Sequence, residues 1–444
     1  MPKINRALLP IKLFYLFYYA AVSSVTPFLP LLLSEKRFSA LSISAVLGAV
    51  RLVAVVTKPL IGCAADRVAN YRTVALCTLA VGATATLLLA RAPSAPALRE
   101  DESSAWTVFG TFPFWMLLLL MTCSYSIGLS PSYTLVDALT LRLLKRDTRL
   151  FGRQRLFMVF GSAGALLAVT GVMDALPHAS YAPCFLSFAG CVVVSALCLL
   201  WVQEAEDVSV ETVPSKVPPT SAVLLACARP SALVFLAVCV ASGVNFGQSV
   251  WMTPFYMRHE LQSTQTAIGV AFAAVCVSSV GALWYSGRIL EHLGRDFVAG
   301  ICVVLYALRA LSWRFLLTNA WQAPAVECLF GVAAGLWLPT MASYASVVAP
   351  RGRKATAQAL LSAAYDGLGV GCGNLLSGFL YDSYGGETAW LCVGASTAAF
   401  GVLYWLGLAA VECAKSKRRQ LLGKAQLLVE HNSQFVLLRA VVDK

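Results

Sequence analysis

Residues 62–74 read GCAADRVANYRTV and place an Asp–Arg pair and a second arginine between two long apolar runs. Only 13% of the 444 residues are charged and 58% are hydrophobic, whereas a soluble chain carries about 25% charged residues. The apolar residues come in runs of about 20, the length that crosses a bilayer as a helix. The charged stretch therefore connects two predicted membrane-spanning helices, and the chain is predicted to be an all-α, multi-pass membrane protein.

The composition argues against several other classes of protein. The net charge of +12 is spread over short loops instead of a basic, aromatic-rich domain, so we expect no nucleic-acid partner. Most of the fourteen cysteines lie in apolar runs, where they act as small packing residues. The four histidines lack metal-ligand spacing, and the sequence has no catalytic cluster at membrane depth. We therefore expect no metal, no cofactor and no enzymatic activity, and a monomer whose partner is the lipid bilayer.

Twelve transmembrane helices are predicted, in two pseudo-symmetric six-helix bundles formed by residues 1–202 and 232–411. The connection between them, 203–231, is rich in Glu, Pro and Ser and is predicted to be a cytosolic linker. The first apolar run has no signal-peptide cleavage site after it, so we expect it to be the first span. The predicted spans are residues 11–33, 41–61, 73–91, 114–139, 154–174, 182–202, 232–256, 266–286, 297–317, 322–347, 356–380 and 388–411.

The loops that would face the cytosol if the N-terminus is inside hold most of the lysine and arginine. The positive-inside rule then places both termini in the cytosol. The kind of membrane, plasma or organellar, stays open. The basic tail, 412–444, either lies on the inner leaflet or extends into solution.

The charged stretch after the second span recurs about half a chain later, after the eighth span, in GRILEHLGR at residues 287–295. Such a repeat is typical of transporters built from two similar halves. Glycine lets two helices approach closely, and an acid there can cap a helix N-terminus or pair with the arginine after it. We interpret both copies as gating elements, the alternative being ordinary positive-inside charge. Their residues are Gly62, Asp66, Arg67 and Arg72 in the first copy and Gly287, Glu291, Gly294 and Arg295 in the second.

The two copies resemble the signature loop of the major facilitator superfamily, G-x-x-x-D-R-x-G-R-[RK]. Residues 62–67 match it, whereas Ala69 and Asn70 replace its second glycine and first basic residue. Four longer stretches resemble the lactose-permease-like branch, which includes major facilitator superfamily domain-containing protein 6. This resemblance covers nearly the whole chain and implies a proton-coupled symporter fold with a central cavity between two bundles. The stretches are LLPIKLFYLFYYA (8–20), FGRQRLFMVFGSAG (151–164), LLTNAWQAPAVECLFG (316–331) and ATAQALLSAAYDGLGVGCGNLLSGFLYD (355–382).

Charged residues inside predicted spans are functional candidates, because each is costly unless it is paired or hydrated. Asp137 and Arg155 lie at similar distances in sequence from the connection between the fourth and fifth predicted spans. Arg309 and Glu327 lie in the same way about the connection between the ninth and tenth. We predict an acid–base pair in each hairpin. The first is interpreted as a substrate clamp. The second is interpreted as a proton site, where Glu327 takes up a proton when it loses Arg309. The alternative for each is a purely structural ion pair.

The resemblance implies the same roles, because lactose permease binds sugar with an acid and an arginine on helices 4 and 5. It uses an arginine on helix 9 and an acid on helix 10 for proton coupling. This chain departs from the permease in having no histidine in any span, and from many relatives in having Ser278 and Ser279 where they carry a glutamate. We expect a secondary transporter of a small polar organic solute, with protons as the coupling ion. A receptor or scaffold that keeps the fold, and a lipid transporter, are the alternatives.

Several other polar residues lie in the predicted spans or near their ends. Arg51 and Asp366 are predicted to pair as a gate, because helices 2 and 11 face each other in this superfamily. Lys58 lies near a span end, where snorkelling explains it, as it does Arg314. Asn245 and Gln248 are candidates for substrate hydrogen bonds or for helix–helix contacts. The glycine-rich run 367–373 is predicted to allow close helix packing.

Overall fold

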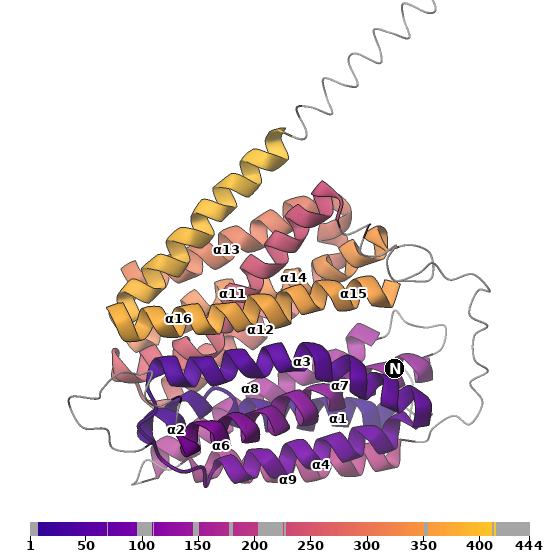
Figure 1. The fold of residues 1–444 in the computed structure, drawn as a ribbon, viewed down its shortest axis with the longest axis vertical. Helices are drawn as coiled ribbons and strands as arrows, with labels where there is room; N and C mark the ends of the chain where they lie inside the picture. Colours follow the sequence, from indigo (N-terminus) through magenta and orange to yellow (C-terminus); the bar gives the residue numbers. More distant parts are fainter. Residues whose placement is uncertain are drawn as a thin grey trace, which may run out of the picture. The chain divides into compact units, whose positions relative to one another are not determined.

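The computed structural model describes residues 8–68, 70–95, 109, 111–144, 151–176, 181–202, 225, 228–349, 354–410 and 413. In these ranges the regular structure is entirely helical (Figure 1). Each of the twelve predicted apolar spans is helical. The elements are α1 (Leu9–Val25), α2 (Leu29–Glu35), α3 (Ala40–Val68), α4 (Tyr71–Leu89), α6 (Phe112–Met121), the π-helix η3 (Thr122–Leu129), α7 (Ser130–Leu144), α8 (Phe151–Ala175), α9 (Ala182–Trp201), α11 (Pro230–His259), α12 (Gln265–Leu293), α13 (Arg295–Phe315), the 3₁₀-helix η5 (Ala320–Gln322), α14 (Ala323–Val348), α15 (Lys354–Ser362), the π-helix η6 (Ala363–Gly369) and α16 (Val370–Tyr384).

Eleven helical stretches of the described residues are long and apolar enough to cross a membrane, the last being Gly386–Ala410. The predicted span 356–380 is not among them, although it is helical as α15, η6 and α16. Its centre carries Asp366 and four glycines, which make it less apolar than the other helices. The described residues thus form a multi-pass membrane protein with eleven strongly apolar helices, and the more polar stretch 356–380 stays a predicted span.

Local sequence explains where several helices begin and end. A proline in the first turn suits a helix start, because its missing N–H would have no partner there. Gly294 separates α12 from α13 with φ of +81°, and Gly385 follows α16 with φ of +82°, a conformation that glycine adopts without strain. Proline occupies the first turn of α1, α2, α6, α9, α11 and α14.

The helices pack mostly with others from the same half of the sequence. In the first half α1 packs on α8 and α9, and α4 packs on η3 and α7. In the second half α14 packs on α12 and α13, and α11 packs on α16. Two long contacts cross between the halves: α3 runs alongside α16, and α8 packs on α12 (Figure 1). Residues that change the contact between the halves should therefore lie mainly on these four helices and on η6, which also contacts α3.

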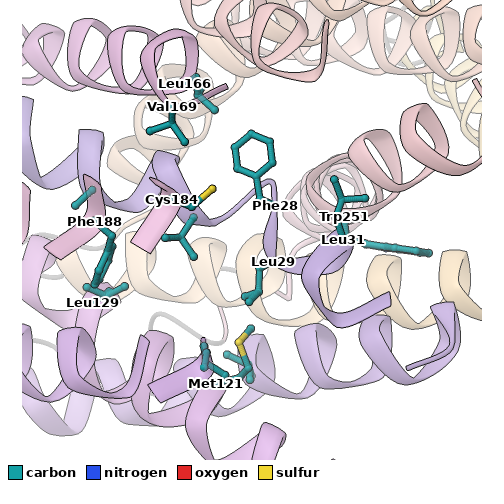
Figure 2. Packing of buried hydrophobic residues seen from close by; sticks show 14 of the residues in the cluster. Phe28, Leu29, Leu31, Met121, Leu129, Leu166, Val169, Cys184, Phe188 and Trp251 are labelled. Carbon is teal, nitrogen blue, oxygen red and sulfur yellow. The ribbon is translucent and has the colours of Figure 1, made fainter. Parts of the chain in front are cut away.

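The buried apolar core draws on both halves of the sequence. Figure 2 shows Phe28, Leu29 and Leu31, at the bend between α1 and α2, among the buried side chains. Trp251 of α11 belongs to the same cluster and is fully buried. The core therefore includes side chains from α1 and α2 in the first half and from α11 in the second half.

By its internal contacts the chain divides into two compact units, residues 1–397 and 398–444. In the second unit residues 398–410 are helical, and the rings of Phe400 and Tyr404 stack with centroids 6.5 Å apart. Most of the predicted linker, 203–231, lies outside the described residues, as does the predicted tail, 412–444, apart from Cys413.

Candidate functional site

Arg309 of α13 and Glu327 of α14 form an ion pair that is almost completely buried. Their side chains are 1% and 3% exposed, and Nη2 of Arg309 lies 2.5 Å from Oε1 of Glu327. Nε of Arg309 donates to the same oxygen at 3.1 Å, and Nε1 of Trp313 does so at 2.9 Å. Nη2 of Arg309 also donates to Oγ1 of Thr253 at 2.8 Å. We call Arg309 and Glu327 the sealed pair.

Aromatic rings enclose the sealed pair. The guanidinium carbon of Arg309 lies 4.8 Å from the centre of the Phe330 ring and 5.2 Å from that of Trp390. Trp390 in turn stacks on Trp313 with centroids 5.1 Å apart. A guanidinium between aromatic faces gains cation–π attraction, which partly offsets the loss of its hydration. The predicted pairing is confirmed, and the pair is isolated from solvent in this conformation.

Asp137 of α7 and Arg155 of α8 form a second pair in a wetter setting. Nη2 of Arg155 lies 3.7 Å from Oδ2 of Asp137, and the side chains are 30% and 19% exposed. The hydroxyl of Tyr15 on α1 donates to Oδ1 of Asp137 at 2.5 Å and lies 3.2 Å from Oγ1 of Thr140. This pairing is also confirmed. We call Asp137 and Arg155 the half-exposed pair.

Asp366 in η6 holds two cations from α3. Nη1 of Arg51 lies 2.9 Å from Oδ1 of Asp366, and Nζ of Lys58 lies 2.8 Å from Oδ2. The predicted Arg51–Asp366 contact is thus present. The interpretation of Lys58 as a snorkelling residue is wrong, because its ammonium points to this carboxylate. We call Arg51, Lys58 and Asp366 the cation cluster.

The cation cluster lies between the two π-helices. Nη1 of Arg51 donates to the hydroxyl of Tyr125 in η3, and the guanidinium carbon lies 4.1 Å from the centre of that ring. Asp366 sits in the other π-helix, η6. A π-helical turn weakens the regular hydrogen-bond ladder, and such turns occur frequently at functional sites. This cluster, which joins α3 to the second half, therefore rests on two locally irregular segments.

Asn245 and Gln248 of α11 are fully buried in this conformation. The amide nitrogen of Asn245 donates to Oγ1 of Thr397 at 3.0 Å, and that of Gln248 donates to Sδ of Met252 at 3.4 Å. The helix–helix alternative is therefore present for Asn245. Contact of either residue with a substrate stays a prediction.

At one end of these helices, aspartates of one half accept hydrogen bonds from backbone N–H groups of the other half. Asp174, in the last turn of α8, accepts from the backbone N–H of Gln265 at 3.0 Å and of Thr266 at 2.6 Å, where α12 begins. Asp382, in the last turn of α16, accepts from the N–H of Leu41 at 3.1 Å, near the start of α3. A carboxylate at a helix N-terminus is favoured by the unpaired N–H groups and by the helix dipole. We call this the Asp174 end. Its contacts were not predicted from the sequence.

The other end of the same helices carries the two repeat copies, and we call it the Gly62 end. A Cβ built on Gly62 or Gly287 meets no described atom within 4 Å, so the predicted close approach of helices at these glycines is wrong for this conformation. Arg67 and Glu291 are exposed, and the side chain of Asp66 lies outside the described part.

The remaining residues of the repeat copies contact backbone atoms or cap helices. Nη1 of Arg72 donates to the carbonyl of Val202 at 2.9 Å, and Nη1 of Arg295 donates to that of Ser343 at 3.5 Å. Asn70, which departs from the signature loop, caps α4 by accepting from the N–H of Thr73 at 2.8 Å. These residues fix the short connections, and the proposed gating role stays a prediction.

The glycine run in η6 and α16 packs as predicted. A Cβ on Gly369 would lie 2.8 Å from Cα of Gly243 on α11, and a Cβ on Gly371 would lie 3.2 Å from the Leu52 side chain on α3. Gly367 likewise contacts α3, and Gly373 contacts α11. Alternate glycines thus let one helix lie close to two neighbours at once, which accounts for the run.

The comparisons with known proteins agree with this architecture. Residues 8–392 match the MFS_1 like family, within the major facilitator superfamily. The chain belongs to this family. The family match, the eleven apolar helices among the described residues and the similarity to transporters agree. Together they identify a protein of a membrane transporter family.

Individual relatives are distant but cover almost the whole chain. Over 403 residues the chain is 25% identical to a maltose permease of Geobacillus stearothermophilus, covering 90% of this chain and 94% of the permease. A crystal structure of the nucleoside transporter NupG superposes with a TM-score of 0.72 at 15% identity, covering 91% of this chain and 99% of that one. A D-xylose–proton symporter superposes with a TM-score of 0.59 at 13% identity, covering 89% and 96%. These likenesses establish the fold.

Four site contacts were not predicted from the sequence, although the spacing along the helix indicates two of them. Lys58 follows Arg51 by seven residues, which is two helical turns, so both lie on one face of α3. Trp313 follows Arg309 by four residues and shares its face in the same way. Tyr15 and Thr253 come from distant helices, and no local pattern predicts their contacts.

Within the described ranges no group of three His, Cys, Asp or Glu side chains is placed to hold a metal.

Proposed function

We propose that the chain is a secondary transporter of the lactose-permease-like branch that moves a small polar organic solute by alternating access, coupled to protons. Its twelve helices form two bundles, residues 1–202 and 232–411, joined by a cytosolic linker at 203–231. The observation that carries this proposal is the pair of matched hairpins, each holding one acid–arginine pair. One pair is half-exposed, as a solute site requires, and one is sealed, as a proton site requires.

The contacts between the halves support alternating access. The Asp174 end is held together by two acids on helix N-termini, whereas no described atom lies within 4 Å of a Cβ on Gly62 or Gly287 at the other end. If the N-terminus is cytosolic, the Asp174 end faces outward and this conformation is open to the cytosol. The reverse conformation must break these backbone contacts and close the Gly62 end, where the repeat copies supply the charges for a new contact.

The sealed pair supports proton coupling through its environment. Arg309 and Trp313 both donate hydrogen bonds to Oε1 of Glu327, so the arginine compensates the buried acid in this conformation. A buried carboxylate that loses its arginine becomes far more costly as an anion, so it takes up a proton. A movement of α13 against α14 that separates the pair would therefore couple protonation to conformation.

The test uses purified protein in liposomes loaded with a pH-sensitive dye. Pools of sugars, nucleosides and other small polar solutes are added outside, and internal pH and solute uptake are recorded together. We expect one pool to acidify the wild-type liposomes as solute enters. Glu327→Gln should abolish the pH change, because the amide cannot carry a proton.

The matched control is Glu387→Gln, because Glu387 also pairs with an arginine, Arg314, but its side chain is 60% exposed. It should leave the pH change intact. Solute entry without any pH change in wild type and Glu327→Gln alike would indicate facilitated diffusion and refute proton coupling. No uptake from any pool would refute transport of small polar solutes and favour a receptor that keeps the fold.

A further inference from the structure

The charges inside the membrane do not balance at the cation cluster. The sealed pair and the half-exposed pair each join one base to one acid. In the cation cluster Arg51 and Lys58 share the single carboxylate of Asp366, which leaves one positive charge over. Among the ion pairs of the described residues, this is the one place where two cations contact the same acid. An unbalanced charge at membrane depth is costly unless water or a bound ion compensates it.

The cluster also has donors to spare. Arginine has five N–H donors and lysine three. The bonds described for Arg51 both leave from Nη1, and Lys58 contacts one carboxylate oxygen. The side chains of Arg51, Lys58 and Asp366 are 17%, 22% and 25% exposed, so solvent reaches the cluster in this conformation. An oxyanion can therefore first reach the remaining donors while the Arg51–Asp366 contact is still made.

We propose that the transported solute is an organic oxyanion, bearing a carboxylate or phosphate group, and that Arg51 and Lys58 bind that group. This rests on the proposed function and narrows its substrate class. The anion neutralises the excess charge of the cluster. Because Arg51 and Lys58 lie on α3 and Asp366 on η6, the bound anion also competes with Asp366 for the cations that join the two halves. Binding thereby loosens the contact that must change during alternating access.

The experiment measures binding, independently of transport, as the thermal unfolding midpoint of the purified full-length protein. The probes are pairs of solutes that differ in the anionic group: glycerol and glycerol 3-phosphate, glucose and glucose 6-phosphate, uridine and uridine monophosphate, and lactamide and lactate. We expect at least one anionic member to raise the midpoint by several degrees, and its neutral partner to leave the midpoint unchanged.

Two substitutions shift the charge of the cluster in opposite directions. Lys58→Gln makes it neutral and should abolish the rise in midpoint. Asp366→Asn adds a positive charge and should lower the anion concentration needed for half of the rise by at least threefold. Arg314→Gln removes the same charge from the exposed pair with Glu387 and should bind like wild type. The opposite expectations for Lys58→Gln and Asp366→Asn keep the test decisive if one variant fails to fold.

Three results would overturn the proposal: equal stabilisation by a neutral partner, an undiminished rise in Lys58→Gln, or no effect of any anionic solute on the wild type. Failure here is distinguishable from failure of the transport proposal. Uptake of neutral solutes alone into liposomes would leave transport standing and refute the oxyanion. Anion binding without uptake of the same solute would do the reverse.

Discussion

The two hairpin pairs have the same chemistry and opposite surroundings. The sealed pair joins Arg309 to Glu327 at 2.5 Å, with a tryptophan and a threonine as further partners. The half-exposed pair joins Arg155 to Asp137 at 3.7 Å, and water reaches both side chains. The spacing of acid and base about the turn is similar in the two hairpins. The difference arises from the neighbours: the rings of Phe330 and Trp390 lie against Arg309, whereas the tyrosines Tyr15 and Tyr19 interact with the second pair.

Burial changes what an ion pair contributes. In water-accessible surroundings an ion pair stabilises a protein by about 0–1 kcal/mol, because solvent screens the attraction. In a dry interior the loss of one partner costs about 3–5 kcal/mol, because the other charge is left without compensation. The sealed pair should therefore contribute more to stability than the half-exposed pair, and the proposed exchange of a partner for a solute would cost less at the half-exposed pair.

The largest expected effect is that of Glu327→Ala. It leaves the Arg309 guanidinium buried beside Thr253 with no carboxylate, so the free energy of unfolding should fall by about 3–5 kcal/mol. Asp137→Ala removes the matching acid of the half-exposed pair and should cost less than Glu327→Ala, because the side chain of Arg155 is 30% exposed and that of Arg309 is 1% exposed. Thermal and denaturant unfolding of the purified proteins in one detergent would measure both. Equal losses in the two variants would contradict the comparison.

The sequence was sufficient to predict which charges pair, but not how wet each pair is. Counting residues from each turn places Asp137 beside Arg155 and Arg309 beside Glu327, because the rise per residue of a helix is fixed. The enclosure of Arg309 depends on Phe330 and on Trp390, which lies 81 positions further along the chain. Such long-range packing has no local signature, so solvent access could not be predicted.

A smaller effect is expected from removing one hydrogen-bond donor from each acid. Trp313→Phe deletes the N–H that donates to Glu327 and keeps an aromatic ring against Trp390, so stability should fall by about 1.5–3 kcal/mol. Tyr15→Phe deletes the matching O–H to Asp137 and should cost less, because water can replace it at the half-exposed carboxylate. The same unfolding measurements decide this. A larger loss in Tyr15→Phe would show that Asp137 is effectively dry.

The contacts between the halves divide in the same way into predictable and unpredictable parts. The Arg51–Asp366 contact was predicted from the resemblance, and the packing of run 367–373 from its glycines. The acids Asp174 and Asp382 cap helices of the opposite half, and nothing near them in sequence marks those partners. At Gly62 the signature motif predicted a close helix contact, but no described atom lies within 4 Å of a Cβ built there. A sequence motif can predict that two helices come into contact, but it does not predict in which conformation they do so.

The smallest effect on stability is expected from Asp137→Asn. This substitution also separates a role in stability from a role in transport. The amide keeps the shape of the side chain and can still accept from Tyr15, while the partly hydrated Arg155 keeps water as a partner. The midpoint of unfolding should stay within about 2 °C of wild type, given a change below about 1 kcal/mol in a chain of this size. Uptake of the solute found in the liposome assay should nevertheless fall by at least tenfold, because a substrate clamp loses its charged acceptor. Glu387→Gln should change neither quantity. Normal uptake by Asp137→Asn would reduce the half-exposed pair to a packing contact, and a large loss of stability would remove its contrast with the sealed pair.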